Sequence, residues 1–289
     1  MRPHETHTSA RWPAVSWTGV RVDDPRTGQD GPRPPGPSVA YLAAAAWLVP
    51  SLMALTKQRW TGGHHLPRDT GFLVCTNHTT YIDPLAIAHY LWGHGVTAHF
   101  MAKAGLFEIP VIGAWLRGCG QLPVHRGSGR AIEALGDAVQ ALADRKCVVI
   151  APEATITRDP DLWPMVGKSG AARIALTTRC PVIPVAQWGP HELLEPYGRP
   201  HPFPRKTMRV QAGPAVDLSD LYDRRQTQVV LREATERIMT AITTEVEQLR
   251  GERAPHGRWD QRHGARIDLT TGEPVGPHTG PHADRSEES

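Results

Sequence analysis

The chain has 289 residues, which is enough for one large domain or for one domain with tails. Its net charge of +3 and isoelectric point near 8.8 are too weakly basic to indicate nucleic-acid binding, although they suit an anionic membrane surface or an anionic substrate. The four cysteines are scattered without a C-x-x-C pair, which argues against a disulfide or zinc framework and favours reduced core residues in a cytosolic protein.

Both ends of the chain are predicted to be disordered tails. Residues 1–37 are polar, rich in Pro, Gly and Arg, and have no early apolar region typical of a signal peptide. Residues 251–289 are rich in His, Gly, Pro and charge. Between the tails, residues 38–250 are predicted to form one domain. It begins with residues 38–60, which are predicted to form an interfacial or membrane helix because they contain an uncharged apolar run and flanking Trp residues. The alternative is a buried helix of a soluble fold.

The rest of the domain alternates short apolar runs with amphipathic segments, and residues 61–220 form its predicted core. The expected strands are 71–77, 96–102, 147–153, 181–188 and 207–213, and the expected helices are 83–92, 110–120, 128–146, 170–179 and the closing helix 229–249. This alternation predicts an α/β fold with a central, mostly parallel or mixed sheet flanked by helices. Polar residues at the carboxyl ends of such strands are expected to converge on one site.

The segment NHTTYID, residues 77–83, follows the first of these strands. A His placed in the turn before a helix can be oriented by an Asp at the helix start and can then take a proton as a general base. His78 and Asp83 have this arrangement, and Asn77 is a candidate for holding the turn by hydrogen bonds and for contacting substrate. The alternative is that Asn77 only marks the end of the strand. Taken alone, the pattern is better explained by Asp83 as a helix cap before Pro84 and His78 as a loop residue.

Companion segments decide between these interpretations. NHTTYID resembles the His-x4-Asp motif of the glycerolipid acyltransferases, the family of 1-acyl-sn-glycerol-3-phosphate acyltransferases. GQLPVHR (120–126), APEATITR (151–158) and VIPVA (182–186) are similar to the later motifs of this family and occur in the same order. The resemblance covers about residues 55–220 and implies a glycerol-3-phosphate acyltransferase-like fold, with His78 and Asp83 as the catalytic pair.

The family also implies residues that bind substrate. Arg126 matches the arginine that meets the phosphate of the acceptor, a task that suits a guanidinium fork, and Lys103 is a possible second cation. Pro184, in the fourth motif, is expected to help wall the substrate pocket. The alternatives are a surface Arg, a solvated Lys and a Pro at a bulge of a buried strand.

The third motif departs from the family pattern. Glu153 and Thr155 match it position by position and are expected to contact substrate, but Ala154 stands where the family usually has Gly. In the family an Arg commonly follows the Thr directly, whereas here two residues intervene and Arg158 is a candidate substitute for it. An Ala is unfavourable if the backbone requires a positive φ. A structural carboxylate that caps a loop or pairs with an Arg is the alternative for Glu153.

The resemblance implies that an acyl chain is transferred from acyl-CoA or acyl carrier protein to the free hydroxyl of 1-acyl-sn-glycerol 3-phosphate, giving phosphatidic acid in phospholipid biosynthesis. It implies no metal and no cofactor, and no nucleic-acid partner. Membrane lipid is the expected partner, and the cytoplasmic face of the cell membrane is the expected location. Two alternatives remain: the same chemistry on another lysolipid or a glycolipid, and a non-catalytic lipid-binding protein on this fold.

Overall fold

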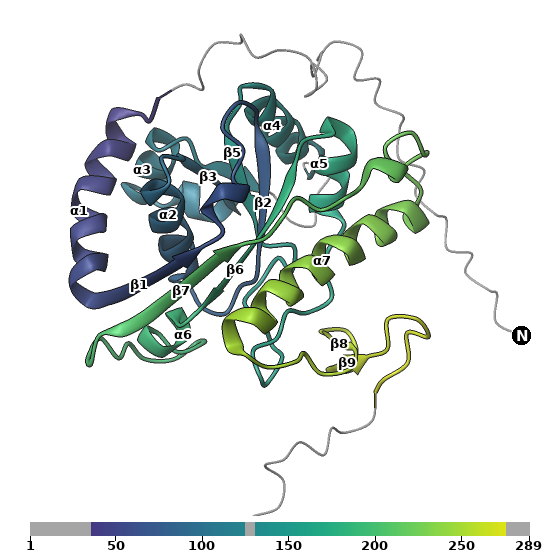
Figure 1. Ribbon diagram of the computed structural model, residues 1–289. Coiled ribbons are helices and arrows are strands. Elements are labelled where there is room, and N and C mark those ends of the chain that lie inside the picture. The colour runs from purple at the N-terminus through teal and green to yellow at the C-terminus, as the bar shows by residue number, and fades with distance from the viewer. Residues whose placement is uncertain (1–35, 125–130, 276–289) are drawn as a thin grey trace, which may run out of the picture.

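The computed structural model describes residues 36–124 and 131–275, and its centre is a mixed, seven-stranded sheet (Figure 1). The strand order is β1-β7-β6-β2-β5-β3-β4, with β6 and β7 antiparallel and the other neighbours parallel. The strands of this sheet are β1 (Thr56–Thr61), β2 (Phe72–Thr76), β3 (Ala98–Lys103), β4 (Leu122–Val124), β5 (Cys147–Ile150), β6 (Val182–Trp188) and β7 (Lys206–Ala212).

Helices flank both faces of the sheet, as Figure 1 shows. They are α1 (Val39–Leu55), α2 (Asp83–Gly93), α3 (Ile112–Gly118), α4 (Ala131–Ala143), α5 (Gly170–Thr178), α6 (Pro190–Leu193) and α7 (Gln228–Arg250), with short 3-10 turns at Gly63–His65, Ala104–Glu108 and Ser219–Leu221. The predicted fold class is confirmed, and the predicted strands and helices of the core lie close to the observed ones.

The alternation of side chains along β2 explains the two layers. Leu73 and Cys75 point into a core shared with α4, α5 and α7, whereas Phe72 and Val74 point into a second core shared with α2. All four side chains are buried. A strand that is buried on both faces reads as a continuous apolar run, which is why the sequence marks it so clearly.

The predicted helix 38–60 is wrong in its last part. The helix ends at Leu55, and β1 (Thr56–Thr61) pairs in parallel with β7 at the edge of the sheet. In β1 the side chains alternate: Trp60 packs on the rings of His89 and Tyr90 while Lys57 and Arg59 are exposed. This alternation of polar and aromatic residues is a strand signal that the apolar run before it obscured.

The predicted tail from residue 251 is also partly wrong. Strands β8 (Arg258–Asp260) and β9 (Ala265–Ile267) form an antiparallel hairpin. Ion pairs hold it, including Arg258 with Glu236 of α7, and Ile267 is buried. Composition predicted disorder because few apolar residues are present, but paired charges do much of the anchoring here.

Helix α1 lies at the β1 edge of the sheet and contacts α3 and β1 (Figure 1). It is predominantly apolar, and Trp47 and Met53 are exposed on it. Within the described residues, none of the helices combines the length and the apolar character needed to cross a membrane.

Candidate active site

Three neighbouring parallel strands bring the candidate residues together at their carboxyl ends. Strand β5 lies between β2 and β3, so their carboxyl ends are adjacent. Asn77 and His78 follow β2, Lys103 ends β3, and Glu153 follows β5. A cavity of about 810 Å³ opens at these strand ends. The predicted convergence of strand ends therefore occurs.

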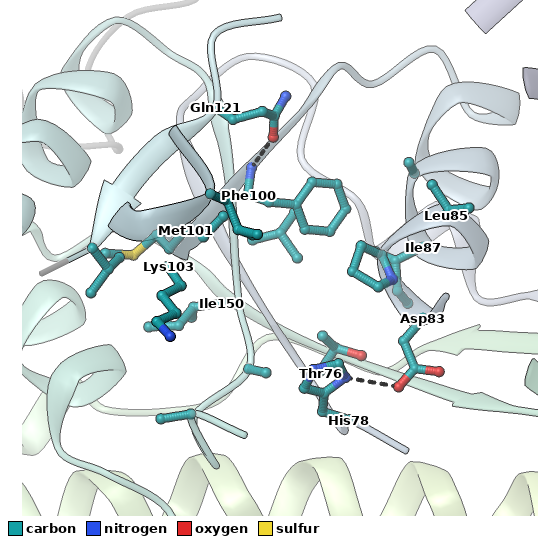
Figure 2. Close-up of a pocket in the computed structure, with 18 of the residues that line it drawn as sticks. Thr76, His78, Asp83, Leu85, Ile87, Phe100, Met101, Lys103, Gln121 and Ile150 are labelled. Atoms are coloured by element: carbon teal, nitrogen blue, oxygen red, sulfur yellow. Dashed lines mark hydrogen bonds and ion pairs between the residues drawn. The ribbon is translucent and has the colours of Figure 1, made fainter. Parts of the chain in front are cut away.

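His78 and Asp83 form a direct pair at this cavity. His78 Nδ1 and Asp83 Oδ2 are 2.9 Å apart, and Figure 2 shows the imidazole and the carboxylate turned toward each other. The carboxylate only accepts, so Nδ1 carries the proton and Nε2 is the basic nitrogen of the ring. The His78 side chain is 22% exposed and lines the cavity, whereas that of Asp83 is 3% exposed. The pair has the geometry of a base held in one tautomer by a buried carboxylate.

The turn between these two residues is held by the same carboxylate. Asp83 begins α2, and its Oδ2 accepts the backbone N–H groups of Thr79 and Thr80, the latter at 2.9 Å. Pro84 follows in the first helical turn, where a missing N–H has no helical partner to lose. Asp83 therefore holds the turn and orients the histidine at once. It is not the helix cap of the alternative interpretation, because Ile82 occupies the N-cap position.

Asn77 fixes the end of β2 to β6. Its Oδ1 accepts the Gln187 N–H at 2.9 Å and its Nδ2 donates to the Gln187 carbonyl at 3.1 Å. In return, Gln187 Nε2 donates to the Asn77 carbonyl at 3.2 Å. Both side chains are buried and both line the cavity. Gln187 was missed in the sequence, where the only signal is a polar residue near the end of an apolar strand.

Glu153 lies behind His78 and does not line the cavity. Its Oε1 accepts the backbone N–H of His78 at 3.1 Å, and its Oε2 accepts the N–H of Met165 at 2.9 Å. Burial raises the pKa of Glu153 to about 8, although the two backbone N–H groups favour the charged form. The contact with substrate expected of Glu153 stays a prediction. In the structure its carboxylate supports the backbone of the candidate base.

The rest of the third motif divides between the cavity and the surface. Thr155 and Ala154 line the cavity, whereas Arg158 is exposed and is not part of its wall. Ala154 has a φ of 61°, the left-handed conformation in which a glycine is unstrained. The positive φ explains why the family usually has glycine at this position. Ala154 adopts the same backbone conformation, but with strain.

Several cationic side chains are candidates for an anion. Lys103 lines the cavity and is labelled in Figure 2, and its binding of substrate stays a prediction. Arg126 lies outside the described residues. Lys168 and Arg173 also line the cavity and were missed. Their only signal in the sequence is their position: Lys168 lies just before the predicted helix 170–179 and Arg173 lies within it, and this helix follows a long connection from the expected strand 147–153.

Pro184 lies inside the sheet. It is buried in β6, opposite Cys75 of β2, and its carbonyl accepts the Gly213 N–H at 2.9 Å. It does not line the cavity, so its predicted contribution to the pocket wall stays a prediction. Its observed role is in the packing between β2 and β7.

Much of the cavity wall is apolar and comes from helices α1, α2 and α3. The contributing side chains include Ala45, Leu48, Leu85, Ala88, Trp92 and Leu116. Figure 2 shows apolar side chains of β3 and β5 around the same space. A candidate catalytic pair beside a mostly apolar cavity, with cationic side chains on the same wall, suits a substrate that has both an apolar chain and an anionic group.

Comparisons with known proteins show similarity to acyltransferases. The family model described as Acyltransferase matches residues 57–188. A chloroplastic 1-acyl-sn-glycerol-3-phosphate acyltransferase of Brassica napus is 29% identical over 156 residues, which are 53% of this chain and 44% of that protein. The 1-acyl-sn-glycerol-3-phosphate acyltransferase of Bacillus subtilis is 29% identical over 126 residues, 44% of this chain and 60% of that protein.

A solved structure supports the fold. The 1-acyl-sn-glycerophosphate acyltransferase PlsC from Thermotoga maritima superposes with a TM-score of 0.56 at 23% sequence identity, covering 74% of this chain and 81% of that one. The chain spans about half the length of the curated relatives it matches. The matched segment, residues 57–188, contains His78, Asp83 and Glu153.

Proposed function

We propose, from the premise that residues 57–188 form an acyltransferase-family domain, that this protein transfers an acyl chain from a thioester to a lipid hydroxyl. The acceptor proposed is 1-acyl-sn-glycerol 3-phosphate, and the donor is acyl-CoA or acyl carrier protein. The observation that carries the proposal is the 2.9 Å pair of His78 and Asp83 at the edge of a mostly apolar cavity. The product is phosphatidic acid, a precursor in phospholipid biosynthesis.

The chemistry assigned to the pair is general base catalysis. The acceptor hydroxyl gives its proton to His78 Nε2 as its oxygen attacks the thioester carbonyl carbon. Asp83 keeps the proton on Nδ1 and stabilises the imidazolium that forms. When the tetrahedral intermediate collapses, the carbon–sulfur bond breaks and the imidazolium returns its proton to the leaving thiolate. The products are an ester and a thiol, and His78 is again neutral.

The cavity offers room for both parts of the lipid substrate. Its apolar wall, built by α1, α2 and α3, suits the acyl chains. The cationic side chains Lys103, Lys168 and Arg173 suit the phosphate of the acceptor or the phosphates of the donor. We assign no single one of them to a phosphate, since their shared position on the cavity wall is the property that supports binding.

The proposed location is a membrane surface at its cytoplasmic face. Exposed apolar side chains occur on α1 and at the neighbouring α3, and they include Val39 at 83% and Trp47 at 74% exposure on α1 and Val111 at 81% exposure just before α3. Such side chains suit the headgroup boundary, where lipid substrate is available. All four cysteines are unpaired and buried, which agrees with a reducing compartment.

The test is acyl transfer by the purified full chain on anionic phospholipid vesicles that contain 1-acylglycerol 3-phosphate, with acyl-CoA as donor. We expect phosphatidic acid from the wild type and sedimentation of the protein with the vesicles. His78→Ala should lower kcat by about 10³-fold, within the range that a general base contributes. His201→Ala is the matched control, because His201 is an exposed histidine paired only with Glu195 on the surface.

Retention of wild-type kcat by His78→Ala would overturn the mechanism. Product from other lysolipids or from glycolipids, but not from 1-acylglycerol 3-phosphate, would replace the acceptor while keeping the chemistry. Failure of the wild type with acyl-CoA and with acyl carrier protein, on every acceptor, would favour the non-catalytic lipid-binding alternative.

A further inference from the structure

The hairpin of β8 and β9 lies against the loop that follows β5. The Val166 N–H donates to the Trp259 carbonyl of β8 at 3.0 Å, so the hairpin is bonded to the end of this loop. The hairpin, residues 258–267, lies beyond the segment 57–188 that matches the acyltransferase family model. We call residues 153–166 the support loop, because Glu153 at its start bonds the backbone of His78.

Arg266 of β9 binds the middle of the support loop through a bidentate ion pair. Its Nε and Nη2 donate to the two carboxylate oxygens of Asp159, each at 2.7 Å. The side chains of Arg266 and Asp159 are 12% and 1% exposed. Asp159 Oδ1 also accepts the N–H groups of Asp161 and Trp163, which shape the loop. A buried carboxylate with these partners depends on its arginine, since the planar fork matches both oxygens and neutralises the charge.

The support loop in turn holds both backbone polar groups of the candidate base. The His78 N–H donates to Glu153 Oε1 at 3.1 Å, and the His78 carbonyl accepts the Thr157 N–H at 2.7 Å. The second oxygen of Glu153 accepts the N–H of Met165, the residue next to Val166. A continuous set of hydrogen bonds therefore runs from the hairpin through the loop to His78.

The other side of the hairpin is fixed to the long closing helix. Arg258 Nη1 pairs with Glu236, and its Nη2 donates to Thr240 Oγ1 at 2.9 Å. Both partners lie on α7, which packs against β6 of the central sheet. The hairpin is thus anchored at its far side to a helix of the core and at its near side to the support loop.

We propose that this hairpin is a brace that fixes the support loop, and through it His78, with Arg266 as a positioning residue. Its kinetic consequence rests on the proposed acyl transfer, whereas its structural consequence does not. Arg266 does not line the cavity, so its loss should displace the base without removing a substrate contact. Small displacements of a catalytic group lower the rate of the chemical step far more than they weaken binding.

The test measures amide hydrogen exchange and steady-state kinetics on the full chain. In Arg266→Ala we expect the amides of His78 and Met165 to exchange at least about 10-fold faster, relative to the core amide of Ile238 in α7. We expect kcat to fall about 10-fold, with KM within about twofold of the wild type. Arg253→Ala is the matched control, because Arg253 is 93% exposed just before the hairpin; it should change neither quantity.

A second variant decides the matter if Arg266→Ala does not fold. Arg266→Lys keeps the charge beside Asp159 but loses the fork, so it should fold and still raise exchange at His78 and Met165 selectively. Equal changes at His78, Met165 and Ile238, or no change at His78, would overturn the brace. If the wild type shows no acyl transfer, the proposed function fails, and the exchange of His78 still decides whether the hairpin holds it.

Discussion

The loops after β2 and after β5 begin at the carboxyl ends of neighbouring strands, yet their carboxylates have different partners. Asp83, reached from the first loop, meets the ring of His78 at 2.9 Å beside the cavity. Glu153, in the second loop, turns away from the cavity and accepts two backbone N–H groups. One carboxylate therefore serves the side chain of the candidate base, and the other serves its backbone.

The difference shows that the sequence motifs do not distinguish a carboxylate that orients the ring of the candidate base from one that holds its backbone. Both carboxylates are buried and both accept backbone N–H groups, so burial alone does not separate them. What separates them is the further partner: Asp83 also pairs with the ionisable ring of His78, whereas the Glu153 carboxylate accepts the backbone N–H groups of His78 and Met165. Substitutions that preserve shape while replacing a carboxyl oxygen with an amide N–H₂ group therefore test the comparison most directly.

The largest effect is expected from Asp83→Asn. The amide would present either its N–H to His78 Nδ1, which moves the ring proton to Nε2, or its oxygen, which leaves the imidazolium without a counter-charge. In both arrangements the base is weakened, and we expect kcat to fall by up to about 10³-fold, no more than the loss of the base itself in His78→Ala. The measurement is steady-state acyl transfer on lipid vesicles.

The matched control for this change is Asp223→Asn, because Asp223 pairs with Arg179 on the surface and is 87% exposed. It should leave kcat within about twofold, since exposed pairs contribute little. An Asp83→Asn variant that retains more than about a tenth of the wild-type kcat would show that this carboxylate only caps the turn, and the contrast between the two loops would disappear.

A smaller loss of activity and a distinct pH dependence are expected from Glu153→Gln. The amide can accept one N–H but would direct its own N–H₂ at the other, so either His78 or Met165 loses a partner. We expect kcat to fall about 10- to 100-fold because the base shifts. At pH 5 the free energy of unfolding should fall by about 1–3 kcal/mol, the cost of one unsatisfied buried group.

The pH dependence follows from the pKa of Glu153, which burial raises to about 8 from an ordinary value of 4.5. Between these values the folded state holds a proton that the unfolded state has released, so the stability contributed by this group is lost as pH rises. Wild-type stability should fall by at most about 5 kcal/mol from pH 4.5 to 8 for this reason. Denaturant unfolding of Glu153→Gln should lack this slope; parallel pH curves for the two proteins would contradict the raised pKa.

The sequence predicted the core of the molecule where periodic patterns are strong. The buried strand 71–77 and the adjoining helix with Asp83 lie close to where the alternation placed them, and the meeting of strand ends followed from parallel topology. The direction of the Glu153 side chain was not predictable, because it depends on amides of His78 and Met165, far apart in the chain. The C-terminal hairpin was missed for a related reason: Arg266 stabilises it through Asp159, 107 residues away.

The smallest effect, an increase in stability, is expected from Ala154→Gly in the second loop. Ala154 has a φ of 61° in the turn where its N–H donates to the Ala151 carbonyl at 3.0 Å. Left-handed backbone costs a residue with a Cβ about 1–2 kcal/mol, and glycine removes this cost while adding about 0.4–1 kcal/mol of unfolded-state entropy. We therefore expect a net gain of about 0.5–1 kcal/mol in the free energy of unfolding, measured by chemical denaturation.

The control for this change is Ala241→Gly in the interior of α7, which should lower stability by about 1 kcal/mol because its backbone is helical. Activity of Ala154→Gly should stay within about threefold of the wild type, since the loop keeps its hydrogen bonds to His78 and only a methyl group leaves the cavity wall. If both glycines destabilise equally, the strain assigned to Ala154 is absent. If Ala154→Gly instead raises stability and lowers kcat more than tenfold, the methyl group itself helps to hold the support loop. The loop after β5 would then affect activity through a side chain on the cavity wall, as the loop after β2 does.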